Sequence, residues 1–517
     1  MEEITLGELR SAVGGILLGD FADPNTVITK VVSDNRMAGP GSVFFAIVGE
    51  KTDGHKYVEA ALAAGAAGCV ISRAPQEYLP GKFYLLVEDT LQAAAQAAAF
   101  YRRKFDIPVV AVTGSVGKTT TKDMIAAVLS VKYHCVKTQK NFNNYIGVPR
   151  TVFTLDRDTE IAVIEMGMNH RGEIHHLVEI AQPTALTITN VGDAHIGLLG
   201  SRENIFRSKC EIFGGLAEGG YAVLNGDNDF LMRLRDEKTR DLIRNTTGMP
   251  KDLVLDFVGE DPACSFRAVD IRDDLPDRVE FTAVTPAGAF PVTVPALGRH
   301  MIYPALTAAA LGLHYGMTIE EIRQGIAGYV ATAMRMEVRT LANGSLLYDD
   351  TYNANPQSME AGLLTLSRVQ GKRRVAVLGQ MGELGAQEEA LHREVGAAAA
   401  KDGIDVLVTV GPLAALIAEE AKRFGLAEVH ACKDKEEAKK VLDALYAPET
   451  AFLVKASRAA ALFRRVKGEP VCMMTGGVAR NAGVVKAIEG ALDLPLFIHE
   501  DAQACGALGA ALFAAEL

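Results

Sequence analysis

The chain contains no tryptophan, and its seven cysteines include no C-x-x-C pair. An odd number of widely spaced cysteines favours buried, reduced thiols over a disulfide framework or a metal cluster. No uninterrupted apolar run approaches the roughly 18 residues that a membrane span needs, and the acidic first stretch, MEEITLGELR, does not resemble a signal segment. These absences predict a cytoplasmic protein without membrane insertion.

A surplus of positive charge is also missing. The 517 residues include 53 Lys and Arg against 64 Asp and Glu, a formal net charge of −11. This balance argues against a protein that coats nucleic acid. Hydrophobic residues make up 49% and charged residues 23% of the chain, as in globular proteins. At roughly 150 residues per domain, the length suggests about three domains.

Short apolar runs alternate with helical patterns along most of the chain. IAVIE, ALTITN and YAVLN are examples from the middle, and RVAVLG, DVLVTV and AFLVKAS are examples from the later part. This alternation predicts α/β domains built on parallel sheets covered by helices. A stretch at about 250–295 has shorter, alternating patterns and suggests a β-rich insertion. We expect the chain to divide into three domains, residues 1–105, 106–330 and 331–467, and a last segment, residues 468–517.

The sharpest local motif is TGSVGKTTT, which begins at Thr113. It follows a short apolar run, Val109–Val112, and precedes a helical pattern. A Gly-rich turn between a strand and a helix is the context of a phosphate-binding loop. The motif therefore predicts a site for a nucleoside triphosphate.

Each residue type in the loop suits phosphate binding. Gly114 and Gly117 let backbone N–H groups face inward, and the helix N-terminus adds positive dipole. Lys118 can reach the outer phosphates, and the hydroxyl of Thr119 can ligate Mg²⁺. Val112 stands where the longer form of the motif has its first glycine. The alternative is a Gly-rich turn with an ordinary surface lysine.

Metal ligands for such a site should lie at strand ends near the loop. Glu165 ends the apolar run IAVIE and is a candidate Mg²⁺ ligand. His195 follows ALTITN, but Mg²⁺ prefers oxygen ligands, and a lone histidine is more often a core or loop residue. A lysine in such a helical pattern is usually exposed, so Lys209, in SKCEIF, would by its residue type alone be an ordinary lysine on a helix surface.

Several spaced motifs together resemble those of the ATP-dependent Mur ligases, which join amino acids to the UDP-linked precursor of peptidoglycan. In order, they are TGSVGKTT, KNFNNYIGVP, EMGMNHRGEI, TNVGDAHIG and SKCEIF. DDTYNANPQSMEAGL and GQMGELG further resemble the branch of the family that adds D-alanyl-D-alanine. SDNR, FFAIVGE and DGH resemble its uridine-nucleotide-binding domain. The resemblance covers roughly residues 25–465.

The resemblance implies an α/β protein with three domains. They would be an N-terminal UDP-binding domain, a central P-loop ATPase domain with a parallel sheet, and a C-terminal Rossmann-like domain. It also implies an enzyme that uses ATP to join D-alanyl-D-alanine to UDP-N-acetylmuramoyl-tripeptide through an acyl phosphate. This would be the last cytoplasmic peptide step of peptidoglycan precursor synthesis. We expect a monomer whose partners are these small-molecule substrates.

The resemblance also implies roles for individual residues. Those implied as catalytic are Lys118, Lys209, His195, Asn143 and Arg335. The implied ATP site comprises Thr113, Gly114, Ser115, Val116, Gly117, Lys118, Thr119, Thr120, Arg335 and Asp350. Two Mg²⁺ ions would bind Thr119, Glu165, His195 and a carbamylated Lys209. The implied substrate contacts are Ser33, Asp34, Arg36, Asp53, His55, Asn144, Tyr352, Asn353, Asn355 and Ser358. The last active-site strand would contribute Lys455, Ser457 and Arg458.

Two parts of the sequence depart from the family pattern. At one or both of the positions of Met301 and Pro304, relatives commonly have an asparagine that faces the adenine. Gln380 stands where an acid is common. No adenine contact is therefore assigned to the stretch that contains Met301 and Pro304.

The last fifty or so residues, which contain MTGGVARNAGVVKAIEGAL, resemble the C-terminal stretch of the activator ATPases of 2-hydroxyacyl-CoA dehydratases. We expect an appended segment, and the alternative is that these residues form the ligase's own terminal strands and helices. Cys472 and Cys505 are expected to be buried thiols rather than cluster ligands.

Two other functions compete with this interpretation. One is a sibling amide ligase, such as the enzyme that adds the third amino acid or a folate polyglutamate ligase. The sequence YNANP after Asp350 argues against both. The other is a nucleotide-binding protein without catalytic activity, which the presence of Lys118, Thr119, Glu165, His195 and Lys209 disfavours.

Overall fold

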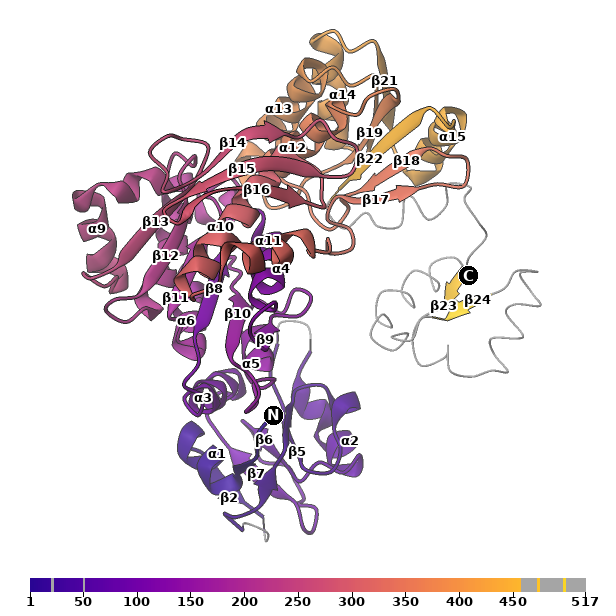
Figure 1. The fold of residues 1–517 in the computed structure, drawn as a ribbon. Helices are drawn as coiled ribbons and strands as arrows, with labels where there is room; N and C mark the ends of the chain where they lie inside the picture. The colour runs from indigo at the N-terminus through magenta and orange to yellow at the C-terminus, as the bar shows by residue number, and fades with distance from the viewer. Residues whose placement is uncertain (20–22, 50–51, 457–471, 475–495, 499–517) are drawn as a thin grey trace.

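The computed structural model describes residues 1–19, 23–49, 52–456, 472–474 and 496–498. Three α/β units follow one another along the chain and are stacked from bottom to top in Figure 1. Ser457, Arg458 and Cys505 lie outside the described residues. Most of the predicted appended segment also lies outside them, and only two short strands of it are described. These are β23 (Cys472–Met474) and β24 (Leu496–Ile498), which pair in parallel.

The first unit contains a five-stranded sheet in the order β2-β7-β6-β5-β4. Strands β4 to β7 run parallel to one another, and β2 is antiparallel to β7. The strands of the unit are β1 (Ile4–Thr5), β2 (Ile16–Leu18), β3 (Val27–Ile28), β4 (Lys30–Val32), β5 (Ser42–Phe45), β6 (Gly68–Ile71) and β7 (Phe83–Leu86). The helices are α1 (Leu6–Val13), α2 (Val58–Ala63) and α3 (Thr90–Arg102). Strands β5 and β6 are buried along their whole length, which explains why almost all of their residues are apolar or glycine.

The alanine-rich helix α3 attaches the first unit to the second. Alanine has the highest helix propensity, and the side chain of Asp89 caps the helix by accepting from two backbone N–H groups. At its other end, the hydroxyl of Tyr101 donates to the carbonyl of Leu155 at 2.7 Å. Arg102 Nε donates to the carbonyl of Ala181 at 2.9 Å. Tyr101 and Arg102 are both buried, so the last turn of α3 is fixed to the central unit.

The central unit is built on a nine-stranded sheet in the order β16-β15-β14-β13-β12-β11-β8-β10-β9. Its strands are β8 (Val109–Thr113), β9 (Cys135–Lys137), β10 (Ile161–Glu165), β11 (Ala185–Ile188), β12 (Tyr221–Asn225), β13 (Val254–Gly259), β14 (Phe266–Arg272), β15 (Val279–Thr285) and β16 (Gly288–Val294). Its helices are α4 (Lys118–Leu129), α5 (Gly147–Val152), α6 (Glu173–Ala181), α7 (Ile196–Leu199), α8 (Arg202–Cys210), α9 (Glu237–Thr247), α10 (Ile302–His314) and α11 (Ile319–Ala327). The carboxyl ends of β8, β10 and β11 lie together because these strands are parallel neighbours.

The stretch at 250–295 is continuous with this sheet rather than a separate insertion. Strand β13 pairs in parallel with β12, and the antiparallel strands β15 and β16 complete the edge. Along β15, buried and partly exposed residues alternate strictly. A strand with one covered face shows this period of two, whereas the inner parallel strands are buried on both faces. This difference explains why the sequence pattern changes while the sheet continues.

The third unit has a six-stranded sheet in the order β17-β18-β22-β19-β20-β21, parallel except for the edge strand β17. Its strands are β17 (Glu337–Thr340), β18 (Leu346–Asp349), β19 (Arg373–Gly379), β20 (Val406–Val410), β21 (Glu428–Cys432) and β22 (Thr450–Lys455). Its helices are α12 (Pro356–Ser367), α13 (Glu388–Lys401), α14 (Ala414–Arg423) and α15 (Lys435–Leu445). In the part of the chain that the structure describes, no helix is long and apolar enough to cross a membrane.

Candidate active site

The Gly-rich loop lies where the motif predicts it, between the end of β8 and the start of α4. Gly114 has φ +151°, and a Cβ atom there would overlap the hydroxyl of Thr189. Gly117 has φ +80° and precedes the first helical residue, Lys118. Both conformations favour glycine. The loop therefore follows its tight path at the helix N-terminus because these two side chains are missing.

A side chain from the loop that follows the neighbouring strand β11 fixes the Gly-rich loop. The Oδ1 atom of Asn190 accepts from the backbone N–H groups of Ser115 at 3.0 Å and Val116 at 2.9 Å. Lys118 Nζ donates to the carbonyl of Gly114 at 2.8 Å, so its ammonium group lies over the loop. Desolvation lowers the pKa of Lys118, and the charge of Arg335 also lowers it. Sequence reasoning missed Asn190, although it lies in the motif TNVGDAHIG.

Glu165 ends β10 next to the loop and is almost completely buried, at 1% exposure. Its Oε1 atom accepts from Asn143 Nδ2 at 2.8 Å and from the hydroxyl of Thr119 at 3.3 Å. Its Oε2 atom is buried and accepts no hydrogen bond from the described residues. A buried carboxylate oxygen without a partner is costly unless a cation or donor joins it. The carboxylate and the threonine hydroxyl are thus oxygen donors suited to a hard cation.

Lys122 is a charged residue of this site that sequence reasoning did not single out. It is 2% exposed, and its Nζ lies 3.7 Å from Glu165 Oε2 and 3.5 Å from Asp123 Oδ1. It comes four residues after Lys118, one turn along α4 and on the same side of the helix. That spacing was the available signal.

His195 lies on the wall of the same cleft and immediately precedes α7. It has φ +66°, which is uncommon for a residue with a side chain. Its Nδ1 atom lies 2.6 Å from Glu383 Oε2, which belongs to the third unit. Desolvation and the charge of Lys118 lower the pKa of His195, against the opposing effect of the Glu383 carboxylate. The imidazole is therefore held in its neutral form near neutral pH.

Lys209 lies on α8 and is fully buried, not on a helix surface. Burial lowers its pKa well below the ordinary value, and the nearby charge of Lys118 lowers it further. A neutral amine at this position is the form that reacts with CO₂, so the environment is compatible with the predicted carbamate.

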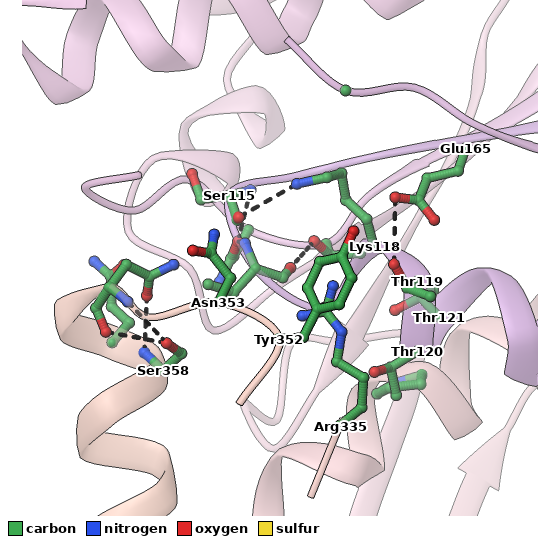
Figure 2. Close-up of a pocket in the computed structure, with 18 of the residues that line it drawn as sticks. Ser115, Lys118, Thr119, Thr120, Thr121, Glu165, Arg335, Tyr352, Asn353 and Ser358 are labelled. Atoms are coloured by element: carbon green, nitrogen blue, oxygen red, sulfur yellow. Dashed lines mark hydrogen bonds between the residues drawn. The ribbon is translucent and has the colours of Figure 1, made fainter. Parts of the chain in front are cut away.

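The third unit contributes charged and aromatic groups from its first loops. The guanidinium of Arg335 stacks on the ring of Tyr352, 3.9 Å from its centroid. Lys455 Nζ pairs with Asp350 Oδ2 at 2.5 Å and donates to the carbonyl of Asn353 at 3.1 Å. Figure 2 shows Arg335, Tyr352 and Asn353 near Lys118 of the loop. The predicted nucleotide contact Asp350 is therefore held by a buried lysine.

Asn355 and Ser358 bond to each other. Asn355 precedes α12, its Oδ1 accepts from the backbone N–H of Ser358 at 2.9 Å, and its own N–H donates to the Ser358 hydroxyl oxygen at 3.1 Å. This reciprocal pattern is a capping box. Both residues thus begin the helix as well as border the cleft.

These residues surround one cleft of about 830 Å³ between the central and third units. The predicted site residues on its wall are Ser115, Val116, Gly117, Lys118, Thr119, Thr120, Asn143, Asn144, Glu165, His195, Arg335, Asp350, Tyr352, Asn353, Asn355, Ser358 and Lys455. The predicted residues outside the wall are Thr113, Gly114, Lys209, Ser33, Asp34, Arg36, Asp53 and His55. Thr113, Gly114 and Lys209 lie buried behind the wall, and the other five belong to the first unit.

The first-unit residues form two small groups. Asp53 accepts from the backbone N–H of His55 at 3.0 Å, contacts its Nδ1 at 2.8 Å and pairs with Arg73. The hydrogen bond from the His55 backbone and the Arg73 guanidinium lower the pKa of Asp53. Asp34 pairs with Arg36 at 2.7 Å on the surface. The structure does not bring these groups into the main cleft.

The part of the cleft wall near the start of α10 contains the two residues that depart from the family pattern. Met301 and Pro304 both line the cleft, and between them the hydroxyl of Tyr303 donates to Asp227 Oδ2 at 2.9 Å. Desolvation raises the pKa of Tyr303, and the charge of Asp227 and the hydrogen bond to it raise this pKa further. Two apolar side chains thus occupy the positions at one or both of which an asparagine was expected.

Two family models match the chain. The Mur ligase middle domain matches residues 112–312, and the Mur ligase glutamate ligase domain matches residues 334–458. Among solved structures, MurF from Acinetobacter baumannii superposes with a TM-score of 0.81 at 32% identity, covering 89% of this chain and 97% of that chain. MurF from Thermotoga maritima in complex with ADP superposes with a TM-score of 0.72 at 27% identity, covering 84% and 96%. The predicted three-domain α/β architecture is confirmed.

Curated relatives extend over most of the chain. The UDP-N-acetylmuramoyl-tripeptide–D-alanyl-D-alanine ligase of Bacillus subtilis strain 168 is 36% identical over 460 residues, which are 88% of this chain and 96% of the relative. The enzyme with the same name from Escherichia coli K12 is 38% identical over 411 residues, 80% and 86% of the two chains. With a phosphate loop, a buried carboxylate and a third unit across the cleft in the arrangement described above, the chain belongs to the Mur ligase family.

Proposed function

We propose that this protein is the ATP-dependent ligase that joins D-alanyl-D-alanine to UDP-N-acetylmuramoyl-tripeptide. The observation that carries the proposal is the single cleft in which the phosphate loop with Lys118 and the third-unit residues Arg335 and Tyr352 face one another. The curated relatives with that activity align over 80–88% of the chain. The proposal includes cytoplasmic peptidoglycan precursor synthesis, a monomeric state and the segment boundaries given above.

The donor atoms suit Mg²⁺ bound together with nucleotide phosphates. No cluster of three or more His, Cys, Asp or Glu side chains that could hold a metal occurs among the described residues. Mg²⁺ commonly uses one or two carboxylates plus substrate phosphates and water, so Thr119 and Glu165 are an adequate protein contribution. His195 and a carbamylated Lys209 would hold a second ion. When bound, the ions would neutralise the charge that crowds the transferred phosphoryl group.

The first chemical step joins two anions. The terminal carboxylate of the tripeptide attacks the γ-phosphorus of ATP, the bond to the bridging oxygen breaks, and ADP leaves with that electron pair. Lys118 and Arg335 supply positive charge where negative charge accumulates. Asn143, which is held by Glu165, can donate to the substrate from the same wall. The product of the step is an acyl phosphate.

The second step forms the amide. The neutral amine of D-alanyl-D-alanine attacks the acyl carbon, and phosphate leaves from the tetrahedral intermediate after the amine loses a proton. Tyr352, Asn353, Asn355 and Ser358 line the cleft on the side of the third unit. We expect the amine to approach from that side. Acyl phosphates hydrolyse in water, so the third unit must cover the cleft during this step.

The first unit would bind the uridine nucleotide. The groups around Asp53 and Asp34 offer carboxylates and arginines at a surface, and Ser33 is exposed beside them. Uracil and ribose present N–H and O–H donors that such carboxylates can accept, and the arginines can pair with the diphosphate.

Phosphate release from MgATP tests the proposal, with UDP-N-acetylmuramoyl-tripeptide and D-alanyl-D-alanine supplied separately and together. We expect release only with both, accompanied by a product whose mass equals that of the joined pentapeptide. Release with a single amino acid in place of the dipeptide would indicate a sibling ligase. A folded sample without release under any condition would indicate a nucleotide-binding protein that lacks activity. Lys118→Ala is the matched control and should abolish release.

A further inference from the structure

The loop that carries His195 is bound by the third unit at several points. This loop, residues 190–197, follows β11 in the central unit. Opposite it lie the first turn of α12 and the loop 380–385 of the third unit. The backbone N–H of Gly197 donates to the carbonyl of Glu383 at 3.1 Å. A Cβ atom on Gly197 would lie 2.6 Å from the backbone nitrogen of Gly385, so the two backbone segments leave no room for a side chain between them.

Gln357 makes a two-point contact with this loop. Its Oε1 atom accepts from the backbone N–H of Asp193 at 3.2 Å, and its Nε2 atom donates to the carboxylate of the same residue. The amide also covers Gly192, where a Cβ atom would overlap it. A glutamine side chain that pairs with both the backbone and the side chain of one residue fixes its orientation as well as its distance.

Asp193 is two residues before His195, and both residues are held from the same side. The carboxylate of Glu383 lies 2.6 Å from Nδ1 of His195. Glu383 and His195 both have positive φ, +64° and +66°. Such backbone conformations persist when surrounding contacts fix them, and here the contacts come from across the interface between units.

We propose that Gln357 is a positioning residue that couples docking of the third unit to the conformation of the His195 loop. The inference rests on the proposed ligase function for its catalytic consequence. With the third unit docked, the Gln357–Asp193 pair holds the loop so that His195 faces the cleft. When the third unit moves away, the loop loses these bonds and His195 loses its fixed position. The site is thus complete only when the cleft is covered.

A charge rearrangement tests the pair directly. Gln357→Glu places a carboxylate against that of Asp193, so repulsion should separate the two. The double variant Gln357→Glu with Asp193→Asn restores complementarity, because the asparagine amide and the backbone N–H can both donate to the new carboxylate. Gln370→Glu makes the same change at an exposed position of the third unit and is the matched control. Thermal unfolding of each variant checks that it is folded.

The first readout is amide hydrogen exchange in the 190–197 segment of the full chain, which needs no substrate and so does not depend on the proposed function. We expect Gln357→Glu to raise the exchange rate there roughly tenfold, the usual effect of losing one charge-assisted hydrogen bond. The double variant should return it to the wild-type rate. Unchanged exchange in Gln357→Glu, or no recovery in the double variant, would overturn the proposal.

The second readout is steady-state ligase kinetics. Gln357→Glu should lower kcat roughly tenfold, with a KM for ATP within about twofold of wild type, since the phosphate loop is untouched. The double variant should recover most of kcat. A rise in the KM for D-alanyl-D-alanine at unchanged kcat would instead make Gln357 a substrate contact and refute the positioning role. If the wild type itself is inactive, the ligase assignment fails while the exchange result still decides the coupling.

Discussion

Replacing Lys122 by methionine should destabilise the central unit through the carboxylates that it leaves behind. The lysine is 2% exposed and lies 3.7 Å from Glu165 Oε2 and 3.5 Å from Asp123 Oδ1. Removing one partner of a buried ion pair costs about 3–5 kcal/mol. Asp123 keeps a second partner, Lys137 at 2.7 Å, whereas Glu165 Oε2 accepts no hydrogen bond among the described residues. We therefore expect the lower end of that range, about 3 kcal/mol.

Urea denaturation measures this effect. The chain has no tryptophan, so the transition is followed by far-ultraviolet circular dichroism, in buffer with EDTA to remove divalent cations. With a slope of about 3 kcal/mol per molar urea, the midpoint for the central unit should fall by about 1 M. Lys122→Met combined with Glu165→Gln should recover at least half of the loss, because the uncompensated charge is gone. Lys238→Met, at an exposed site on α9, is the control. An unchanged midpoint in Lys122→Met, or a double variant weaker than the single one, would refute the reasoning.

Three further changes should have measurable effects. Gly114→Ala should abolish ATP binding in a calorimetric titration while the protein stays folded, since a Cβ atom there overlaps Thr189. Tyr101→Phe removes the 2.7 Å hydrogen bond to Leu155 and should cost about 1 kcal/mol in a denaturation experiment, so no loss would contradict the proposed anchoring. His195 has a lowered pKa in the folded state, so the unfolded state binds more protons below pH 6.5. The free energy of unfolding should fall as the pH drops from about 6.5, and His195→Gln should reduce this dependence.

The local parts of the fold and site were predictable from sequence. The loop around Lys118 is specified by neighbours in the chain: an apolar strand, two glycines with positive φ and a helix start. Glu165 was predictable because it ends an apolar run. In both cases a single element carries the signal, so periodicity and spacing were sufficient.

Contacts between distant segments were not predictable in this way. Gln357 looks like an ordinary helix residue, and only the packing of the third unit on the central one shows that it faces Asp193. The spacing of Lys122 from Lys118 indicated its side of α4, but only the packing of α4 on β10 shows that it reaches Glu165. The alternative interpretation of Lys209 as an ordinary surface lysine was wrong for the same reason, since its burial depends on how α8 packs. Asn355 is a predicted site residue that also caps a helix, a role that the sequence NANPQS would have allowed us to predict.

The anchored end of α3 has a mechanical consequence. Tyr101 and Arg102 donate hydrogen bonds to carbonyls of the central unit. We therefore expect the first two units to move together as one rigid body. A change in the width of the cleft must then be produced at the connection after α11. There, Met334 and Met336 flank Arg335 with φ of +61° and +53°. Arg335, which we propose to contact the phosphates, therefore lies at this connection. Rotation of the third unit and the approach of its guanidinium to the phosphate loop would then be the same motion.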